Sequence, residues 1–268
     1  MAGEVLVSAP DGAGVVTVRL HHAGRLNAMT RAMWRALRAA FDPLAHEPAV
    51  RCVVVEGEGG AFCAGGDISE YPGFRFDAAQ LRDFHENDVW GALAAMLACD
   101  VPLVAALAGP CMGAGVEIAS CCDIRIAADD ARFGAPIAKL GFPMAPREAQ
   151  LVAGAVGEGV ARQMLLEAAT FSAAQMHAQG FVSRVVAPNA LAGEVARSAQ
   201  RIAALAPQAA RLNKRTFRAL KQVQTHAGKS FIATENIVNG TDDPYAYADS
   251  VEHREGIGAF LAKRPPVF

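Results

Sequence analysis

The sequence predicts an α/β fold built on a mainly parallel sheet. Short β-branched runs alternate along the chain with longer segments of helical periodicity, as in strands joined by helical crossovers. From about Ala190 the strand signals stop, and a segment rich in alanine, arginine and glutamine continues to Pro265 and Pro266. We therefore expect an α/β core followed by a helical C-terminal module.

The expected strands are short apolar runs bounded by turns or polar residues. They are Val15–Leu20, Arg51–Glu56, Leu103–Leu107 and Ile124–Ala127. Between them, Thr30 is expected to cap a helix that runs through Phe41. Asp77 is a plausible cap for a helical segment over Phe76–Cys99, and Val116–Cys122 is expected to form a short helix.

Composition limits the class of function. Of the 268 residues, 52% are hydrophobic and 19% charged, which allows a large core in one main domain. The net charge of −2 and the pI near 6.4 provide no basic field, so we expect no nucleic-acid or membrane partner. Met1–Pro10 does not resemble a secretory signal, and we expect a cytoplasmic protein.

The cysteines are expected to be reduced thiols of the core. No two of them form a CxxC pair, which argues against both a disulfide framework and a zinc site, so we expect no metal. They are Cys52, Cys63, Cys99, Cys111, Cys121 and Cys122.

Two glycine-rich segments carry the most specific signal. Glu58–Ile68 reads EGGAFCAGGDI, and Val101–Ala128 reads VPLVAALAGPCMGAGVEIASCCDIRIAA. Both are similar to loop motifs of the crotonase superfamily, the enoyl-CoA hydratase/isomerase family. Matches at Leu26–Ala28, Phe133–Pro136 and the tail from Glu255 lie in the same order, so the resemblance spans nearly the whole chain.

The resemblance implies a ββα spiral core over residues 1–195 and a helical oligomerisation module over residues 196–268. It also implies an enzyme that acts on an acyl-CoA thioester, with coenzyme A as part of the substrate and no separate cofactor. The usual assembly of the family is a homotrimer or a dimer of trimers.

Chemistry on such a thioester places negative charge on its carbonyl oxygen. Two convergent backbone N–H groups can hold this charge, and losing one such donor costs about 3 kcal/mol of barrier. By position in the motifs, the resemblance assigns the donors to Gly66 and Ala114. Glu117 stands where hydratases of the family have a glutamate that activates water.

The chain departs from the family pattern at Ile137. Two-carboxylate hydratases carry a second glutamate after the proline of F-G-x-P-E, whereas this chain reads Phe133 to Ile137 as FGAPI. An isoleucine cannot exchange a proton, so either Glu117 acts alone or another acid replaces the missing one. Lys139 is expected to face solvent or a neighbouring subunit.

Several residues could supply a substitute acid. The ordinary interpretation of each is a surface or structural residue, and the sequence does not choose among them. They are His85, Glu86, Asp88, Arg147 and Glu148.

The resemblance also implies a set of residues that hold coenzyme A. Ala64, Asp67 and Ile68 would line the adenine side through their backbones, and Asp67 is expected to cap the following turn as well. Arg25 would approach the phosphates. Phe260 and Lys263 would reach the nucleotide from the C-terminal helix, often that of an adjacent subunit.

Hydration of a 2-enoyl-CoA is the leading interpretation of these residues. Decarboxylation, or another specialised enolate reaction, is a second interpretation because of Ile137. A CoA-ester binding protein without turnover is a third.

Overall fold

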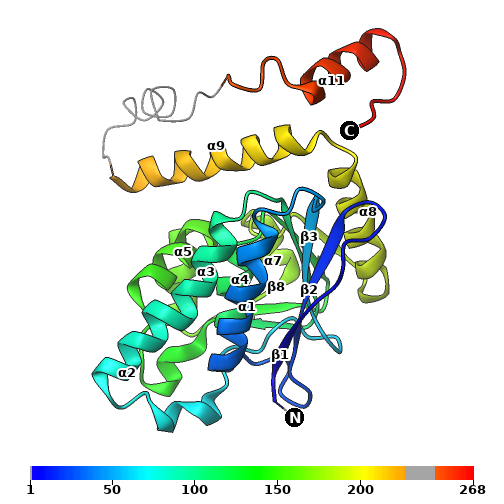
Figure 1. Cartoon of the computed structure of the whole chain (residues 1–268). Coiled ribbons are helices and arrows are strands. Elements are labelled where there is room, and N and C mark those ends of the chain that lie inside the picture. Colours follow the sequence, from blue (N-terminus) through cyan, green and yellow to red (C-terminus); the bar gives the residue numbers. More distant parts are fainter. Residues whose placement is uncertain (1, 227–244) are drawn as a thin grey trace.

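The computed structural model describes residues 2–226 and 245–268, which form two sheets surrounded by helices (Figure 1). The strands are β1 (Glu4–Val7), β2 (Val15–His21), β3 (Cys52–Gly57), β4 (Leu103–Leu107), β5 (Pro110–Met112), β6 (Ile124–Ala128), β7 (Arg132–Gly134), β8 (Thr170–Ser172) and β9 (Arg184–Val186). The α-helices are α1 (Arg31–Leu44), α2 (Ala78–Asp83), α3 (Trp90–Ala98), α4 (Ala114–Ser120), α5 (Pro146–Val156), α6 (Glu158–Leu166), α7 (Ala173–Ala178), α8 (Leu191–Ala203), α9 (Pro207–His226) and α11 (Val251–Leu261). Short 3₁₀ helices are η1 (Ile68–Gly73), η3 (Pro136–Leu140) and η4 (Pro188–Ala190), and η2 (Phe84–Val89) is a π-helical segment.

The main sheet has the strand order β1-β2-β3-β4-β6-β9. Strand β1 runs antiparallel to β2, and the other neighbours are parallel, which confirms the expected α/β architecture. A second sheet has the order β5-β7-β8. The expected strands are all present, with bounds that differ by at most one residue at either end.

Helices cover both faces of the main sheet. Helices α1 and α3 pack side by side on one face (Figure 1), where the larger apolar core lies. On the other face, α8 packs its Leu191 and Val195 into a smaller core with Val54 and Val104. Because both faces are buried, the central strands are apolar throughout, as in β4, where every residue is buried.

The N-terminal caps expected for α1 and α2 are confirmed. The Thr30 side chain accepts a hydrogen bond from Met33 N at 3.1 Å, and Asp77 accepts one from Gln80 N at 2.8 Å. The expected helix over Phe76–Cys99 is, however, divided into α2, the π-helical segment η2 and α3. The extra residue per turn of a π-helix changes the direction in which the following side chains point.

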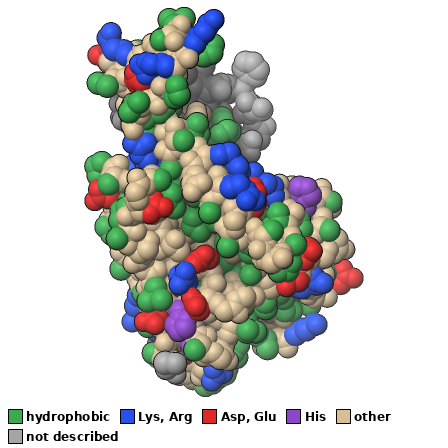
Figure 2. Space-filling model, turned by 90° about the vertical axis from the view of Figure 1, so that its right-hand side faces the viewer, with side chains coloured by type: hydrophobic (Ala, Val, Ile, Leu, Met, Phe, Trp, Pro, Cys, Tyr) green, Lys and Arg blue, Asp and Glu red, His purple; other side chains and the backbone are tan. Residues whose placement is uncertain are grey.

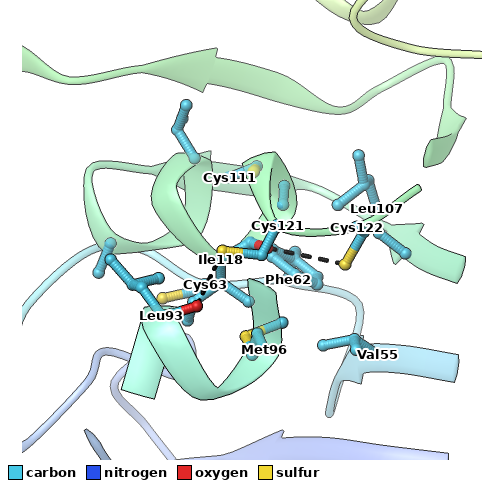
Figure 3. Close-up of a cluster of buried hydrophobic side chains, with 14 of the residues drawn as sticks. Val55, Phe62, Cys63, Leu93, Met96, Leu107, Cys111, Ile118, Cys121 and Cys122 are labelled. Carbon is cyan, nitrogen blue, oxygen red and sulfur yellow. Dashed lines mark hydrogen bonds between the residues drawn. The ribbon is translucent and has the colours of Figure 1, made fainter. Parts of the chain in front are cut away.

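The six cysteines are buried and none forms a disulfide, as expected for core thiols. Figure 3 shows Cys63, Cys111, Cys121 and Cys122 among apolar side chains, including Phe62 of the first glycine-rich segment. Burial raises the pKa of Cys63 to about 12 and that of Cys122 likewise to about 12, so both remain protonated thiols near neutral pH.

Helices α9 and α11 lie outside the α/β core (Figure 1). Helix α9 lies across the body of the molecule, and α11 lies beyond α9 (Figure 1). Basic side chains attach α9 to the core, for example Lys214 to Asp123 at 2.8 Å and Arg218 to Asp100 at 2.7 Å. The expected boundary at residue 195 falls inside α8, which packs on the sheet, and the division into two domains stays a prediction.

The surface carries charges of both signs. On the face shown in Figure 2, acidic and basic side chains are interspersed and apolar side chains lie between them. Across residues 2–226 and 245–268, no helix has the length and apolar character that crossing a membrane requires.

Asp88 of η2 joins this segment to α1, and its loss should destabilise the fold. Its carboxylate, of which 5% is exposed, accepts hydrogen bonds from Arg31 Nε at 2.5 Å and Arg35 Nε at 2.7 Å. Asp88→Ala leaves the largely buried Arg31 without this partner, so we expect a loss of about 2–3 kcal/mol in urea unfolding. Asp83→Ala removes an exposed partner of the same arginine and should cost much less. Equal losses in the two variants would contradict this account.

Candidate functional site

A cavity of about 350 Å³ opens between the two glycine-rich segments. Its walls come from these two segments and from η1, η2, η3 and α5, which are far apart in the sequence. The lining residues used below are Ala64, Gly66, Ile68, Tyr71, Arg75, His85, Gly113, Ala114, Glu117, Ile137, Lys139, Phe142 and Glu148.

Backbone hydrogen bonds hold the two glycine-rich segments together. Cys63 N donates to Pro110 O at 3.0 Å, and Met112 N donates to Cys63 O at 2.8 Å. Cys63 and Cys111 thereby form an isolated parallel bridge between the first segment and β5. The two segments therefore leave this bridge side by side, directly before they reach the cavity.

A turn at a glycine follows the bridge in each segment. Gly65 has φ of 114° and Gly113 has φ of 48°, which are conformations that residues with a side chain rarely adopt. The two glycines also approach each other closely, because a Cβ added to Gly113 would lie 3.7 Å from the Cα of Gly65. Each turn precedes one of the expected donors, namely Gly66 and Ala114.

The N–H groups of Gly66 and Ala114 lack an acceptor within residues 2–226 and 245–268. Their neighbours Ala64, Asp67 and Gly113 all donate to backbone carbonyls. Ala114 is buried and Gly66 partly buried, and both line the cavity, so their N–H groups are available to an acceptor atom bound there. Ala114 is also the first residue of α4, where the helix dipole adds partial positive charge.

Tyr71 places a hydroxyl beside one of these donors. A Cβ added to Gly66 would lie 2.2 Å from Tyr71 Oη, so the hydroxyl is close to the backbone of the first segment. Burial raises the pKa of Tyr71 to about 12, which keeps the phenol protonated. The cavity therefore places a neutral hydroxyl group beside the backbone of Gly66.

Glu117 is the carboxyl group that α4 directs to this cavity. It is buried, with 7% of its surface exposed, on a short helix whose residues are all buried. Burial, and secondarily the charge of Glu148, raises the pKa of Glu117 well above its usual value. A carboxyl group with a raised pKa can exchange a proton near neutral pH.

Glu148 and His85 form a hydrogen-bonded pair in the wall of the same cavity. His85 Nδ1 lies 2.8 Å from Glu148 Oε1, and 18% and 5% of the two side chains are exposed. Ile137 lines the same cavity and supplies no polar atom there. Neither residue is exposed at the surface, and their contact joins η2 to α5 in the wall of the cavity.

The other candidates for a substitute acid lie elsewhere. Glu86 forms a surface ion pair with Arg147 at 3.1 Å, with about half of each side chain exposed. Asp88 binds the arginines of α1. Lys139 is exposed, as expected, but it also contributes to the cavity wall.

The expected coenzyme A residues divide into three groups. Ala64 and Ile68 line the cavity, whereas Asp67 caps η1 by accepting from Ser69 N at 3.0 Å, as expected. Arg25 is exposed. Burial acts to raise the pKa of Asp67, but the hydrogen bonds from Ser69 and the charge of Arg25 lower it, and the net shift of this pKa is downward. Phe260 lies on α11 and Lys263 just beyond it. Both are exposed and outside this cavity wall.

Tyr71, Arg75 and Phe142 were not expected at the site. The Arg75 guanidinium lies 3.6 Å from the ring centroid of Phe142 and 4.7 Å from that of Tyr71. Tyr71 lies in η1, Arg75 just beyond it and Phe142 between η3 and α5, where no strong periodicity indicates the direction of the side chains. For Glu148 a signal did exist, because Val152 and Val156 follow at intervals of four on the buried face of α5.

The raised pKa of Glu117 predicts a pH-dependent stability difference. Above about pH 4.5, Glu117 is ionised in the unfolded chain but still protonated in the folded one, so the free energy of unfolding falls as pH rises. Glu117→Gln removes this loss. In urea unfolding, its stability relative to wild type should therefore increase with pH, by about 1.4 kcal/mol for each unit of pKa shift. Glu86→Gln, at an exposed site, should show no such trend, and a difference for Glu117→Gln that stays constant with pH would contradict the argument.

Comparisons with known proteins agree on one family. A family model for enoyl-CoA hydratase/isomerase matches residues 11–268. The probable enoyl-CoA hydratase echA8 of Mycobacterium tuberculosis is 31% identical over 264 residues, which cover 98% of this chain and 97% of that protein. The crotonyl-CoA hydratase of Syntrophomonas wolfei is 31% identical over 247 residues, which cover 91% of this chain and 90% of that protein.

Solved structures give the same result for the fold. An enoyl-CoA hydratase/carnithine racemase from Magnetospirillum magneticum matches with a TM-score of 0.88 and 33% identity, covering 100% of this chain and 96% of the other. This match confirms the crotonase-like fold expected from the sequence. The chain therefore belongs to the enoyl-CoA hydratase/isomerase family of the crotonase superfamily and is an enzyme of that family.

Proposed function

We propose that this enzyme hydrates a 2-enoyl-CoA, holding the thioester oxygen with the N–H groups of Gly66 and Ala114. The observation that carries the proposal is that these two donors, unpaired among the described residues, line one cavity with the buried Glu117. Addition of water to the β-carbon moves electrons onto the thioester oxygen. Two fixed backbone donors stabilise this charge more than they stabilise the neutral substrate, which lowers the barrier.

Glu117 has the properties of the base that activates the water. A carboxylate that accepts a proton from water works best when its pKa lies near the working pH, and burial moves the pKa of Glu117 in that direction. The names of the relatives, a probable enoyl-CoA hydratase and a crotonyl-CoA hydratase, support the same reaction class.

Coenzyme A would lie along the first glycine-rich segment. Ala64 and Ile68 line the cavity there, and Arg25 is exposed near Asp67, where it could meet the phosphates. Phe260 and Lys263 would reach the nucleotide of a neighbouring subunit in a trimer or a dimer of trimers. The exposed apolar side chains of α11, among them Phe260 at 82% and Leu261 at 75%, support such an assembly.

Decarboxylation of a malonyl-type thioester is the second candidate reaction. Ile137 favours it, since an apolar side chain now lies in the cavity wall where hydratases of this family carry a glutamate. Decarboxylation also produces an enolate on the thioester oxygen, so the two N–H donors would serve it equally. Release of carbon dioxide from methylmalonyl-CoA, without hydration of any enoyl-CoA, would identify this reaction.

Replacing Glu117 tests the proposed reaction directly. Hydration of crotonyl-CoA and longer 2-enoyl-CoAs is followed by the loss of enoyl thioester absorbance. Glu117→Gln keeps the shape of the side chain but cannot accept the proton, so we expect kcat to fall by about 10²-fold or more. Glu86→Gln should retain the wild-type rate. Equal rates for Glu117→Gln and wild type would exclude Glu117 from the mechanism.

The turn at Gly113 provides a test of the donors. Gly113→Ala forces a side chain into a φ of 48° and should cost about 1–3 kcal/mol of stability or displace the Ala114 N–H. If the N–H moves, kcat for hydration should fall at least tenfold, since one donor is worth about 3 kcal/mol. Ala114→Gly keeps the N–H and should change kcat only a few-fold. A variant Gly113→Ala that is as stable and as active as wild type would contradict the proposed role.

A further inference from the structure

We propose that His85 and Glu148 form the second acid–base group of this active site, in place of the carboxyl group that Ile137 cannot supply. The inference rests on the proposed hydration of an enoyl-CoA and names the group that would protonate the α-carbon. Both residues line the same cavity as Glu117, Gly66 and Ala114.

The geometry of the pair is that of a proton-exchanging unit. His85 Nδ1 and Glu148 Oε1 are 2.8 Å apart, and 5% of the carboxylate side chain is exposed. A histidine held by a carboxylate has a fixed ring orientation and a fixed tautomer, which leaves its other nitrogen available to a reacting group. The pair is therefore oriented before any substrate arrives.

Local structure on both sides brings the two residues into the cavity. His85 lies in the π-helical segment η2, and such segments are frequent at functional sites because they redirect side chains. Its neighbours Glu86 and Asn87 are exposed, so His85 is the polar residue of this turn that reaches the cavity. Glu148 lies on the buried face of α5 with Val152 and Val156.

A purely structural role for Glu148 does not explain its position. In the first turn of a helix, a glutamate commonly bonds to the backbone at the helix start. Here the hydrogen bond of the Glu148 carboxylate is with His85, which belongs to another element and lines the same cavity. A buried carboxylate that only joined two elements would not need to line that cavity.

The charge of Glu148 also acts on Glu117, since it is the second cause, after burial, of the raised pKa of Glu117. Glu148 therefore influences the proton affinity of Glu117 from within the same cavity. The addition of water needs two proton-exchanging groups, because one proton leaves the water and another must reach the substrate.

In the proposed step, water adds across the double bond of the enoyl thioester. The water oxygen bonds to the β-carbon while its proton passes to Glu117 in its ionised form, and the π electrons move to the thioester oxygen between Gly66 N and Ala114 N. When the enolate collapses, a new C–H bond forms at the α-carbon with the proton held by the His85–Glu148 pair. Proton exchange with solvent after product release returns Glu117 and the pair to their initial states.

The test uses two variants on different elements. Glu148→Gln keeps a hydrogen bond to His85 but cannot exchange a proton, and His85→Asn places an amide nitrogen near the position of Nδ1. The matched control is Glu86→Gln, which removes a carboxylate adjacent to His85 that pairs with Arg147 at the surface. For each protein, kcat and KM for hydration, the Kd for a saturated acyl-CoA and the melting temperature are measured.

We expect both variants to lose about 10²-fold or more in kcat, with the Kd and the melting temperature close to wild type and the control unchanged. A structural role would instead change the melting temperature or the Kd together with kcat. If wild type hydrates enoyl-CoAs and both variants retain kcat within threefold, the inference is wrong while the proposed function stands. If wild type binds acyl-CoA but hydrates no enoyl-CoA, the proposed function fails first and the inference fails with it.

Discussion

The site depends on the backbone pairing between the two glycine-rich segments. The bridge at Cys63 and Cys111 fixes the distance between two loops that are separated by about fifty residues in the sequence. Beyond it, Gly65 and Gly113 turn the chain so closely together that neither can carry a side chain without strain or contact. The backbone bridge and these two turns therefore position the main-chain N–H groups of Gly66 and Ala114 at the cavity.

Burial gives the same cavity its acid–base character. The helix that begins at Ala114 is buried along its whole length, so the carboxyl group of Glu117 is removed from bulk water and its pKa rises. The same low polarity strengthens hydrogen bonds from backbone donors to a charged oxygen. One feature of the fold, a short buried helix next to the first glycine-rich segment, thus supports both parts of the proposed chemistry.

Local sequence patterns predicted much of the fold, and the resemblance to the crotonase superfamily supplied the expected site residues Gly66, Ala114 and Glu117. The caps at Thr30 and Asp77 depend on interactions within a few residues, and the apolar runs of the strands and the glycine-rich segments are visible directly in the sequence. The contact between His85 and Glu148 was less predictable. His85 and Glu148 meet only because a π-helical turn redirects one side chain and the packing of α5 places the other, and both effects arise from tertiary structure.

The central claim is that two main-chain nitrogens bind one thioester oxygen. The most direct measurement is a crystal structure of the enzyme with an unreactive acyl-CoA analogue that retains the thioester carbonyl. The account predicts that the carbonyl oxygen lies about 2.7–3.1 Å from both Gly66 N and Ala114 N, with Glu117 facing the β-carbon. A thioester oxygen that contacts only one of these nitrogens, or neither, would contradict it.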